Sequence, residues 1–244
     1  MEASTLTLIA DEFPELHPYA TELRRISRAC VDIEIGTSPI SNASSRFGGL
    51  PFVPPDFEWP VHAAGEYRFL GQINFSEIQT PPSPLPSKGL LCLFYLHDEN
   101  GNAFWQDDGF VIGMYWDDNE CHQLVPSPKD PPAIACALTL TPGFRLPERR
   151  ELIELEDFDE EALEALTTGV PEIIHRTDQW MLGYPRYDSL CYDPTPGPGW
   201  IPLLTLPSLD AFDWCWHDGN MLMIFIETTR LATADFSGLK CDAG

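Results

Sequence analysis

The sequence predicts an α+β protein with a largely antiparallel β-sheet core, an N-terminal helix and two related halves. Three observations support this prediction. Apolar runs of strand length recur along the chain, loops rich in glycine and proline separate them, and one succession of motifs occurs twice. A chain of 244 residues can bury one substantial core. We therefore expect a single domain that spans residues 1–244.

The N-terminal segment, at about residues 1–36, is expected to be largely helical. In "DEFPELHPYATELRRISRAC" the prolines stand near the start, and apolar residues then recur at helical spacing. This pattern predicts a helix from about Pro18 to Cys30. The next stretch, "VDIEI", alternates apolar and acidic residues and is followed by Gly36. It therefore predicts a strand.

Further strands are predicted from "YRFLGQINFSEI", "GLLCLFYL" and "FVIGMYW". The prolines of "QTPPSPLPSK" exclude regular structure there, and the Asn-Gly pair in "DENGNAFW" is typical of a hairpin turn. "PSPKDPPA" is a proline-rich linker, and "ELIELEDF" alternates like a strand. "DFDEEALEALTTG" predicts a short helix that is capped by Asp157 or Asp159 and ends at Gly169.

One order of motifs occurs in both parts of the chain. "FGGLP", "FLGQINFSEI" and "GLLCLFYL" correspond to "MLGYP", "IPLLTLPSLD" and "GNMLMIFIE" in the last third. This correspondence predicts an internal duplication, with a first half at about residues 45–125 and a second half at about 135–240. Neither half has enough strands to bury its apolar faces alone, so the halves are expected to share one core.

The composition is strongly acidic, with 38 Asp and Glu against 14 Lys and Arg and a net charge of −24. Such a surface repels phosphate backbones, so we expect no nucleic acid and no membrane as a partner. The apolar runs are shorter than the roughly 20 residues of a membrane helix, and acids occupy the N-terminus where a signal peptide needs basic residues. We therefore expect a cytoplasmic protein. The acidic excess serves either solubility or attraction of a basic protein partner.

The cysteines and histidines do not form a metal-binding pattern. The seven cysteines are spread over the chain without a Cys-x-x-Cys pair, so we expect reduced core thiols, no metal site and no cofactor. "DENGN" places oxygen-bearing side chains at alternate positions, as a calcium loop does. Ala103 and Gly109 occupy the positions where such a loop needs glycine and glutamate, so a turn is the favoured interpretation.

The motifs of common enzymes are missing from the sequence. It contains no Gly-x-Ser-x-Gly, His-Glu-x-x-His, Gly-x-Gly-x-x-Gly or Walker loop. Six histidines could include a general base. Catalysis therefore stays an open alternative, and no catalytic residue is predicted.

The stretch "SRFGGLPFVPPDFEWP", residues 45–60, is the candidate for a binding loop. It combines adjacent glycines, four prolines and large rings, which suits a stiff corner of the fold. Rings beside polar loop residues also suit a partner groove. We expect Arg46, Phe57 and Trp59 to project from this corner. The full set of predicted binding residues is Arg46, Gly48, Gly49, Phe57, Trp59 and Gln72.

Five stretches carry a resemblance to a known family. "SRFGGLPFVPPDFEWP", "FLGQINFSEI", "LPSKGLLCLFY", "MLGYPRY" and "DGNMLMIFIETTRLATADF" resemble, in order from about Ser45 to Phe236, the motifs of the YwqG-like family of bacterial proteins of unknown function. The resemblance implies a compact, largely antiparallel α+β domain without an established reaction or cofactor. It also implies a loose association with bacterial toxin systems.

The chain departs from that family at two positions. The glutamine that usually follows the Gly-Tyr-Pro motif is absent in "YPRYDSL", and Thr205 stands at the second-half counterpart of Gln72. A function that depends on paired glutamines is therefore in doubt. The sequence favours a non-catalytic acidic module that binds and neutralises a basic protein partner, in the manner of an immunity protein for a toxin. The alternative is a small-ligand module or an unrecognised enzyme that uses the loop around Arg46–Gln72.

Overall fold

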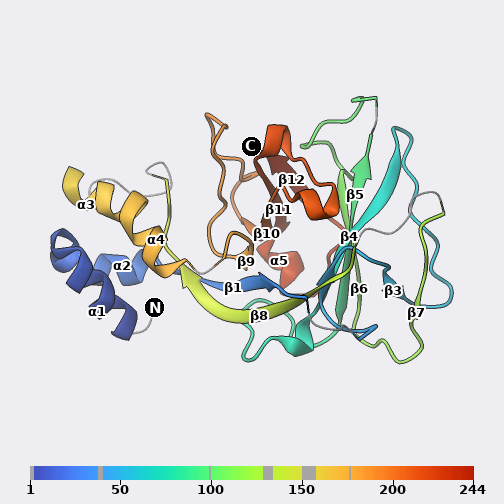
Figure 1. Ribbon diagram of the computed structural model, residues 1–244, viewed down its shortest axis with the longest axis horizontal. Coiled ribbons are helices and arrows are strands. Elements are labelled where there is room, and N and C mark those ends of the chain that lie inside the picture. Colours follow the sequence, from blue (N-terminus) through green and yellow to red (C-terminus); the bar gives the residue numbers. More distant parts are fainter. Residues whose placement is uncertain (1–2, 38–40, 99, 129–133, 150–157, 176) are drawn as a thin grey trace.

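The computed structural model describes residues 3–37, 41–98, 100–128, 134–149, 158–175 and 177–244 (Figure 1). The strands of the described residues form a large sheet and a small sheet. The strands of a large sheet are β1 (Arg28–Ile35), β2 (Arg46–Phe47), β4 (Glu66–Asn74), β5 (Leu90–His97), β6 (Val111–Trp116), β8 (Cys136–Arg145), β9 (Trp180–Leu182), β10 (Trp200–Pro207), β11 (Met221–Glu227) and β12 (Lys240–Ala243). A small sheet pairs β3 (Phe52–Val53) with β7 (Gln123–Leu124).

The helices of the described residues are short. They are α1 (Ala3–Glu12), α2 (Ala20–Ile26), α3 (Glu160–Glu164), α4 (Val170–Ile174) and α5 (Thr228–Leu231). Four of them, α1 to α4, gather at one end of the molecule, on the left of Figure 1. Their apolar side chains form a cluster of their own with Leu146 and Phe158, in which Ile9 and Leu166 are fully buried.

The large sheet has ten strands in the order β12-β11-β10-β9-β1-β8-β2-β4-β5-β6. Neighbouring strands run antiparallel wherever their pairing is described. The predicted, largely antiparallel α+β class is therefore confirmed. The N-terminal strand β1 lies between β8 and β9, so strands from early and late parts of the chain alternate at the centre of the sheet.

The sheet curls into a near-barrel whose two ends approach each other. A Cβ atom added to Gly113 of β6 would lie 3.0 Å from the carbonyl oxygen of Phe236, which precedes β12. The rings of Tyr115 and Phe236 are 5.3 Å apart. A side chain at Gly113 would require the far end of the sheet to move by a few tenths of an ångström, because its backbone is so close.

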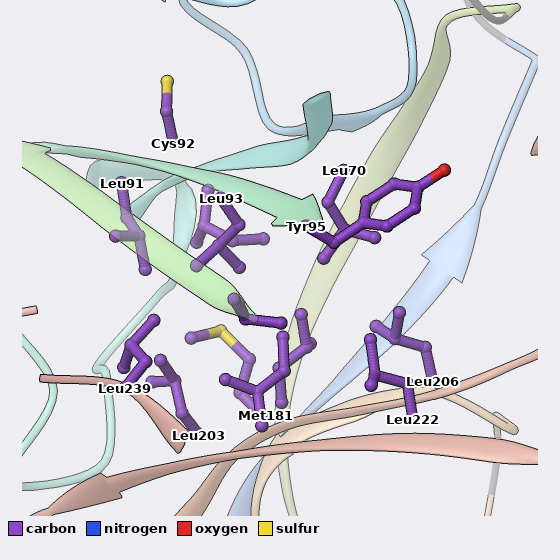
Figure 2. Packing of buried hydrophobic residues seen from close by; sticks show 14 of the residues in the cluster. Leu70, Leu91, Cys92, Leu93, Tyr95, Met181, Leu203, Leu206, Leu222 and Leu239 are labelled. Carbon is purple, nitrogen blue, oxygen red and sulfur yellow. The ribbon is translucent and has the colours of Figure 1, made fainter. Parts of the chain in front are cut away.

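The main core lies inside this near-barrel. In Figure 2, Leu91 and Leu93 of β5 point toward Leu203 and Leu239, whereas Cys92 points to the opposite side of the strand. The cluster continues from β4 and β5 to β10 and β11. Strands from early and late in the chain therefore bury their apolar faces against each other.

The predicted strands at "VDIEI", "YRFLGQIN", "GLLCLFYL" and "VIGMYW" are confirmed as β1, β4, β5 and β6. The predicted helix from Pro18 to Cys30 has different bounds. Residues Pro14–Tyr19 form a 3₁₀ helix, α2 ends at Ile26, and β1 begins at Arg28. The prediction that Cys30 is helical was wrong. This residue lies in β1 and pairs with β8 on one side and with β9 on the other.

The predicted helix in the second half is also longer than expected. Asp159 caps α3, where its carboxylate accepts a hydrogen bond of 2.9 Å from the amide of Ala162. Gly169 does not end the helix, because a π-turn at Ala165–Gly169 leads directly into α4. The predictions for "ELIELEDF" and for most of "PSPKDPPA" lie outside the described residues. No helix in the part of the chain that the structure describes is long and apolar enough to cross a membrane.

Thr205 of β10 offers a test of the core. Its side chain is fully buried, and its hydroxyl has no hydrogen-bond partner among the described residues. Thr205→Val keeps the shape and removes the unpaired hydroxyl, so we expect the free energy of unfolding to rise by about 1 kcal/mol in urea titrations. Thr139→Val on the exposed side of β8 is the control, with an expected change within about 0.5 kcal/mol. A loss of stability in Thr205→Val would contradict the conclusion that the buried hydroxyl of Thr205 lacks a hydrogen-bond partner among the described residues.

Candidate functional site

The candidate site is a cleft of about 470 Å³ that faces β4 and β5. One side comes from the glycine-proline loop and the two strands, and the other side comes from the loop at Asp210–Trp214. Its ring-bearing lining residues are Trp59, Phe69, Tyr95, Phe212 and Trp214. The cleft therefore lies between segments about 150 residues apart in sequence, and neither segment forms it alone.

Ring contacts fix one wall of the cleft. Phe212 stacks on Trp214 with ring centroids 4.6 Å apart, and Phe47 meets the same indole edge-on at 5.4 Å. Trp214 also packs against Trp216 at 5.7 Å. Aromatic pairs in these arrangements add about 0.5–1.5 kcal/mol each beyond burial. These ring contacts therefore hold Trp214 in place in the wall.

The opposite wall is fixed through Trp59. Its indole nitrogen donates a 3.0 Å hydrogen bond to the carbonyl of Tyr67, and its ring lies edge-on to Phe94 at 5.6 Å. Phe69 packs against the same Phe94 ring at 5.5 Å. The polar end of the indole is thus satisfied by the backbone, which leaves its ring as the surface offered to the cleft.

The edge of the cleft is polar. Arg68 lies 3.4 Å from Asp213, whose side chain is 91% exposed, and Asp210 is exposed beside it. Asp213 adopts a left-handed conformation with φ of 58°, a conformation that Asp tolerates better than most residues. An exposed ion pair of this kind contributes at most about 1 kcal/mol. The two carboxylates therefore contribute more to the charge of the surface than to the stability of the fold.

The predicted site residues lie in three places: in the lining of the cleft, behind the cleft, and in a buried network beneath it. Gly49 and Trp59 line the cleft. Gly48 lies behind it, where an added Cβ would be 2.2 Å from the carbonyl oxygen of Ile134. Phe57 also lies behind the cleft, since it is stacked on Phe94 at 5.9 Å and edge-on to Trp59 at 5.8 Å.

Arg46 does not project from the corner, contrary to the sequence-based expectation. Its side chain is buried, with 2% exposed, and its guanidinium donates to the carbonyls of Asn42 at 2.9 Å and Leu50 at 2.6 Å. It also donates to the side-chain oxygen of Gln72 at 3.0 Å. Burial lowers the pKa of Arg46. The arginine is fully occupied by the protein itself.

Gln72 completes this network and is likewise fully buried. Its amide nitrogen donates to the carbonyls of Asn42 at 3.1 Å and Ser44 at 2.9 Å, and its oxygen accepts from the amide of Phe52 at 3.1 Å. Arg46 and Gln72 together fasten the loop before β2 and the chain after it to β4. Their place is beneath the cleft, where they hold its wall.

The loop Asp210–Trp214 is the part of the site that sequence reasoning missed. Arg68, Phe212 and Asp213 had no predicted role. The signal was present in "DAFDWCW", where acids alternate with rings. Nothing in the sequence places this segment opposite Trp59, because only closure of the near-barrel brings the two together.

A second polar cluster joins the helices to the sheet. Arg145 of β8 is buried, lies 3.0 Å from Asp32 of β1, and stacks on Trp180 with its guanidinium carbon 3.5 Å from the ring centroid. Glu148 follows β8 and lies 2.8 Å from the ring of His175, just after α4. Since these groups come from strands and from the helical end, the cluster fixes the two parts to each other.

The buried thiols are poor nucleophiles. Burial, with a smaller contribution from Asp32, raises the pKa of Cys30 to about 12, and burial raises that of Cys92 to about 12. Burial also raises the pKa of Cys241. A thiol must be deprotonated to attack or to ligate a metal, so none of these three does so near neutral pH.

No group of three or more His, Cys, Asp or Glu side chains in the described residues is placed to hold a metal ion. At the "DENGN" stretch, Asp98 accepts hydrogen bonds from the amide of Asn100 at 3.0 Å and from that of Ala103 at 2.7 Å. Its carboxylate thereby stabilises the turn, as the sequence analysis expected. Desolvation alone would raise the pKa of Asp98, but the backbone hydrogen bonds from Ala103, Asn100, Asn102 and Gly101 together hold it below its ordinary value.

These features define an antiparallel, near-barrel α+β domain with an aromatic cleft and an acidic edge. The chain belongs to the family described as "Domain of unknown function (DUF1963)", whose model matches residues 45–242. No curated protein matches the chain. The family match begins at the glycine-proline loop and covers the strands from β2 to β11 and most of β12, including both sides of the cleft.

Glu148 gives the cluster a defined pH dependence. Burial alone would raise its pKa, but His175, Arg186 and Arg145 together lower it below the ordinary value of 4.5. A carboxylate with a lowered pKa stabilises the fold above its unfolded-state pKa, and this contribution is lost as the pH falls through the folded-state value. We expect Glu148→Gln to lower the free energy of unfolding by about 1–3 kcal/mol at neutral pH.

The difference between wild type and Glu148→Gln should shrink as the pH falls below about 4. Urea titrations of both proteins across this range measure it. Glu164→Gln, an exposed change on α3, is the matched control and should have little effect at either pH. A difference that stays constant down to about pH 3 would show that the lost stability has another origin.

Proposed function

We propose that the protein is a non-catalytic, acidic binding module whose cleft receives a basic segment of a protein partner. The observation that carries this proposal is the combination of an aromatic cleft with two exposed carboxylates at its edge, Asp210 and Asp213, of which Asp213 also lies 3.4 Å from Arg68. The faces of aromatic rings attract cations, and carboxylates at the edge add to that attraction. A lysine or arginine flanked by apolar residues fits this chemistry.

The charge of the whole chain supports the same kind of partner. With a net charge of −24, the protein attracts basic surfaces over a distance, which raises association rates at low salt. The cleft would supply the short-range contacts and the specificity. Under this proposal, association should slow steeply as ionic strength rises.

The most specific form of the proposal is neutralisation of a toxin, as in an immunity protein. Its support is the resemblance of five motifs to the YwqG-like family and the acidic surface. A cytoplasmic, bacterial setting belongs to this form of the proposal. Co-expression with the product of a neighbouring gene tests it, since an immunity protein forms a complex and protects the cell from that product.

A second candidate is a small-molecule ligand for the same cleft. Its volume of about 470 Å³ falls within the range of about 300–1,000 Å³ that is typical of ligand pockets. A small molecule that binds only the folded state must raise the unfolding midpoint. A thermal-shift screen therefore separates the candidates: a neutral metabolite that stabilises the protein would favour this second function over the first.

An internal duplication accounts for the position of the cleft and is proposed with it. The strand order of the large sheet is unchanged when β1, β2, β4, β5 and β6 are exchanged with β8, β9, β10, β11 and β12 and the order is read from the other end. The proposed counterparts therefore stand at matching positions about the boundary of β1 and β8. The cleft then lies where a loop of the second half meets strands of the first.

Two exposed positions allow the cleft to be tested without disturbing the core. Ala211 lines the cleft and is exposed, and Asp210 is exposed beside it. Ala211→Trp should fill the cleft, and Asp210→Lys should repel a basic segment. We expect each change to weaken binding of a peptide with lysine between leucines by about tenfold or more, which corresponds to about 1.4 kcal/mol.

Fluorescence anisotropy of the labelled peptide measures this binding. Glu164→Lys on α3 is the control, because it makes the same charge change on an exposed site of the helical end. A peptide with glutamate in place of lysine should lack the part of the binding that Ala211→Trp and Asp210→Lys remove. If Glu164→Lys weakened binding as much as Asp210→Lys, net charge rather than the cleft would be responsible, and the proposal would fail.

A further inference from the structure

A second concave surface lies at the helical end of the molecule, away from the cleft. It is a groove of about 770 Å³ lined by α1, the last residues of α2, α4 and the far ends of β1 and β8. In Figure 1 these elements lie on the left, whereas β4 and β5 of the cleft lie on the right. The groove and the cleft share no lining residue. The two surfaces can therefore be occupied independently.

The walls of the groove expose large aliphatic side chains. Leu8 of α1 is 44% exposed and Ile173 of α4 is 40% exposed. Both helices bury their other apolar residues in the helical cluster, Ile9 on α1 and Val170 on α4 among them. Leu8 and Ile173 are thus left outside that cluster, and both line the same groove. An apolar pair on facing helices suits the apolar side chains of an incoming segment.

The groove also contains an arginine, Arg24 of α2. Arg24 is exposed and makes no salt bridge to any described residue. Its neighbours differ, since Arg25 pairs with Glu22 and Arg28 lies over the ring of Tyr184 at 3.9 Å. The chain has 38 acids and 14 basic residues, so Arg24 is one of few positive charges that it exposes. Its charge is complementary to a carboxylate on whatever occupies the groove.

The polar part of the lining favours a polypeptide over a purely apolar ligand. Thr5 and Ser27 bring hydroxyl groups to the groove, and the Ser27 hydroxyl already donates to the carbonyl of Arg24 at 2.9 Å. At the floor, the charge of Asp32 is balanced by Arg145 at 3.0 Å. The groove thus offers apolar walls, hydrogen-bonding groups and one available positive charge.

We propose that this groove docks an amphipathic, acidic segment of a second protein. Apolar side chains of the segment lie between Leu8 and Ile173, and one of its carboxylates pairs with Arg24. This partner has the opposite charge preference to the segment proposed for the cleft. The protein would then hold two different partners, a basic one at the cleft and an acidic one at the helical end.

The test uses the full-length protein and a pair of labelled peptides. Each is amphipathic and about 15 residues long, since shorter isolated helices are marginal in water. One peptide carries leucines on one face with glutamates beside them, and its twin has lysines in place of the glutamates. Fluorescence anisotropy should show binding of the glutamate peptide. The lysine twin, which suits the acidic surface elsewhere, should not compete for this site.

Variants locate the binding site. Arg24→Glu and Ile173→Ser change exposed residues. Each should weaken binding of the glutamate peptide by about tenfold or more, because a charge pair or an apolar anchor is lost. Lys88→Glu is the charge-matched control, since Lys88 is 67% exposed and lies outside the groove. Ala211→Trp fills the cleft and should leave this binding unchanged. A failure of the cleft proposal is therefore distinguishable from a failure here.

Four results would overturn the proposal. The first is competition of the lysine twin with the glutamate peptide for the same site, and the second is no loss of binding in Arg24→Glu. The third is binding of dodecanoate, but not of the glutamate peptide, in an Arg24-dependent way, which would identify an acyl-chain site. The fourth is a dimer in analytical ultracentrifugation that Arg24→Glu dissociates, which would make a second copy of the chain the occupant.

Discussion

The ladder between β1 and β8 is the interaction on which the rest of the structure depends. It runs without a break from the Arg28–Arg145 pair to the Ile35–Leu138 pair. β1 also pairs with β9, and β8 pairs with β2, so this ladder joins the two sides of the sheet. Without it the near-barrel would separate into two sheets, each with an unpaired edge and an exposed apolar face. The contact between Arg145 and Asp32 fastens its end nearest the helices.

The sequence was sufficient to predict the strands of this fold where the pattern was local. β5 is a continuous apolar run because it is buried along almost its whole length, and β1 was found from its alternation. Cys30 was misassigned because a helical spacing in the sequence cannot reveal pairing with β8 and β9, which come more than 100 residues later. Arg46 was expected to be exposed since arginine is rarely buried. The carbonyl groups that surround it come from irregular backbone, which leaves no pattern in the sequence.

The candidate site shows the same limit. Gly49 and Trp59 could be identified because glycines and rings stand close together in one stretch. The second wall, at Phe212 and Trp214, depends on closure of the sheet. Both proposed binding surfaces have this property, since the groove also combines α1 with α4, more than 150 residues away. In an acidic chain, the few exposed groups of defined chemistry at such junctions are where specificity can arise, because the net charge alone attracts basic surfaces without selecting among them.

The glycine-proline corners at "FGGLP" and at "MLGYP" make different contacts. We call them the first and the second corner. Arg46 pairs with Gln72 across β2 and β4, and Trp180 pairs with Thr205 across β9 and β10. At the first corner the polar pair binds its own loop and holds the wall of the cleft. At the second corner, the residues that the structure describes form no such pair.

Trp180 connects the second corner to the helical end instead. Its indole donates to the carbonyl of Tyr184 at 3.0 Å, and the Tyr184 hydroxyl donates to the carbonyl of Ile26 in α2 at 2.7 Å. Arg145 stacks on the same indole at 3.5 Å. Trp180 provides the flat ring on which Arg145 stacks. A polar pair such as Arg46 and Gln72 offers no such ring. The second corner thus attaches the helices, and with them the groove, to the sheet, and the hydroxyl of Thr205 beside Trp180 has no hydrogen-bond partner among the described residues.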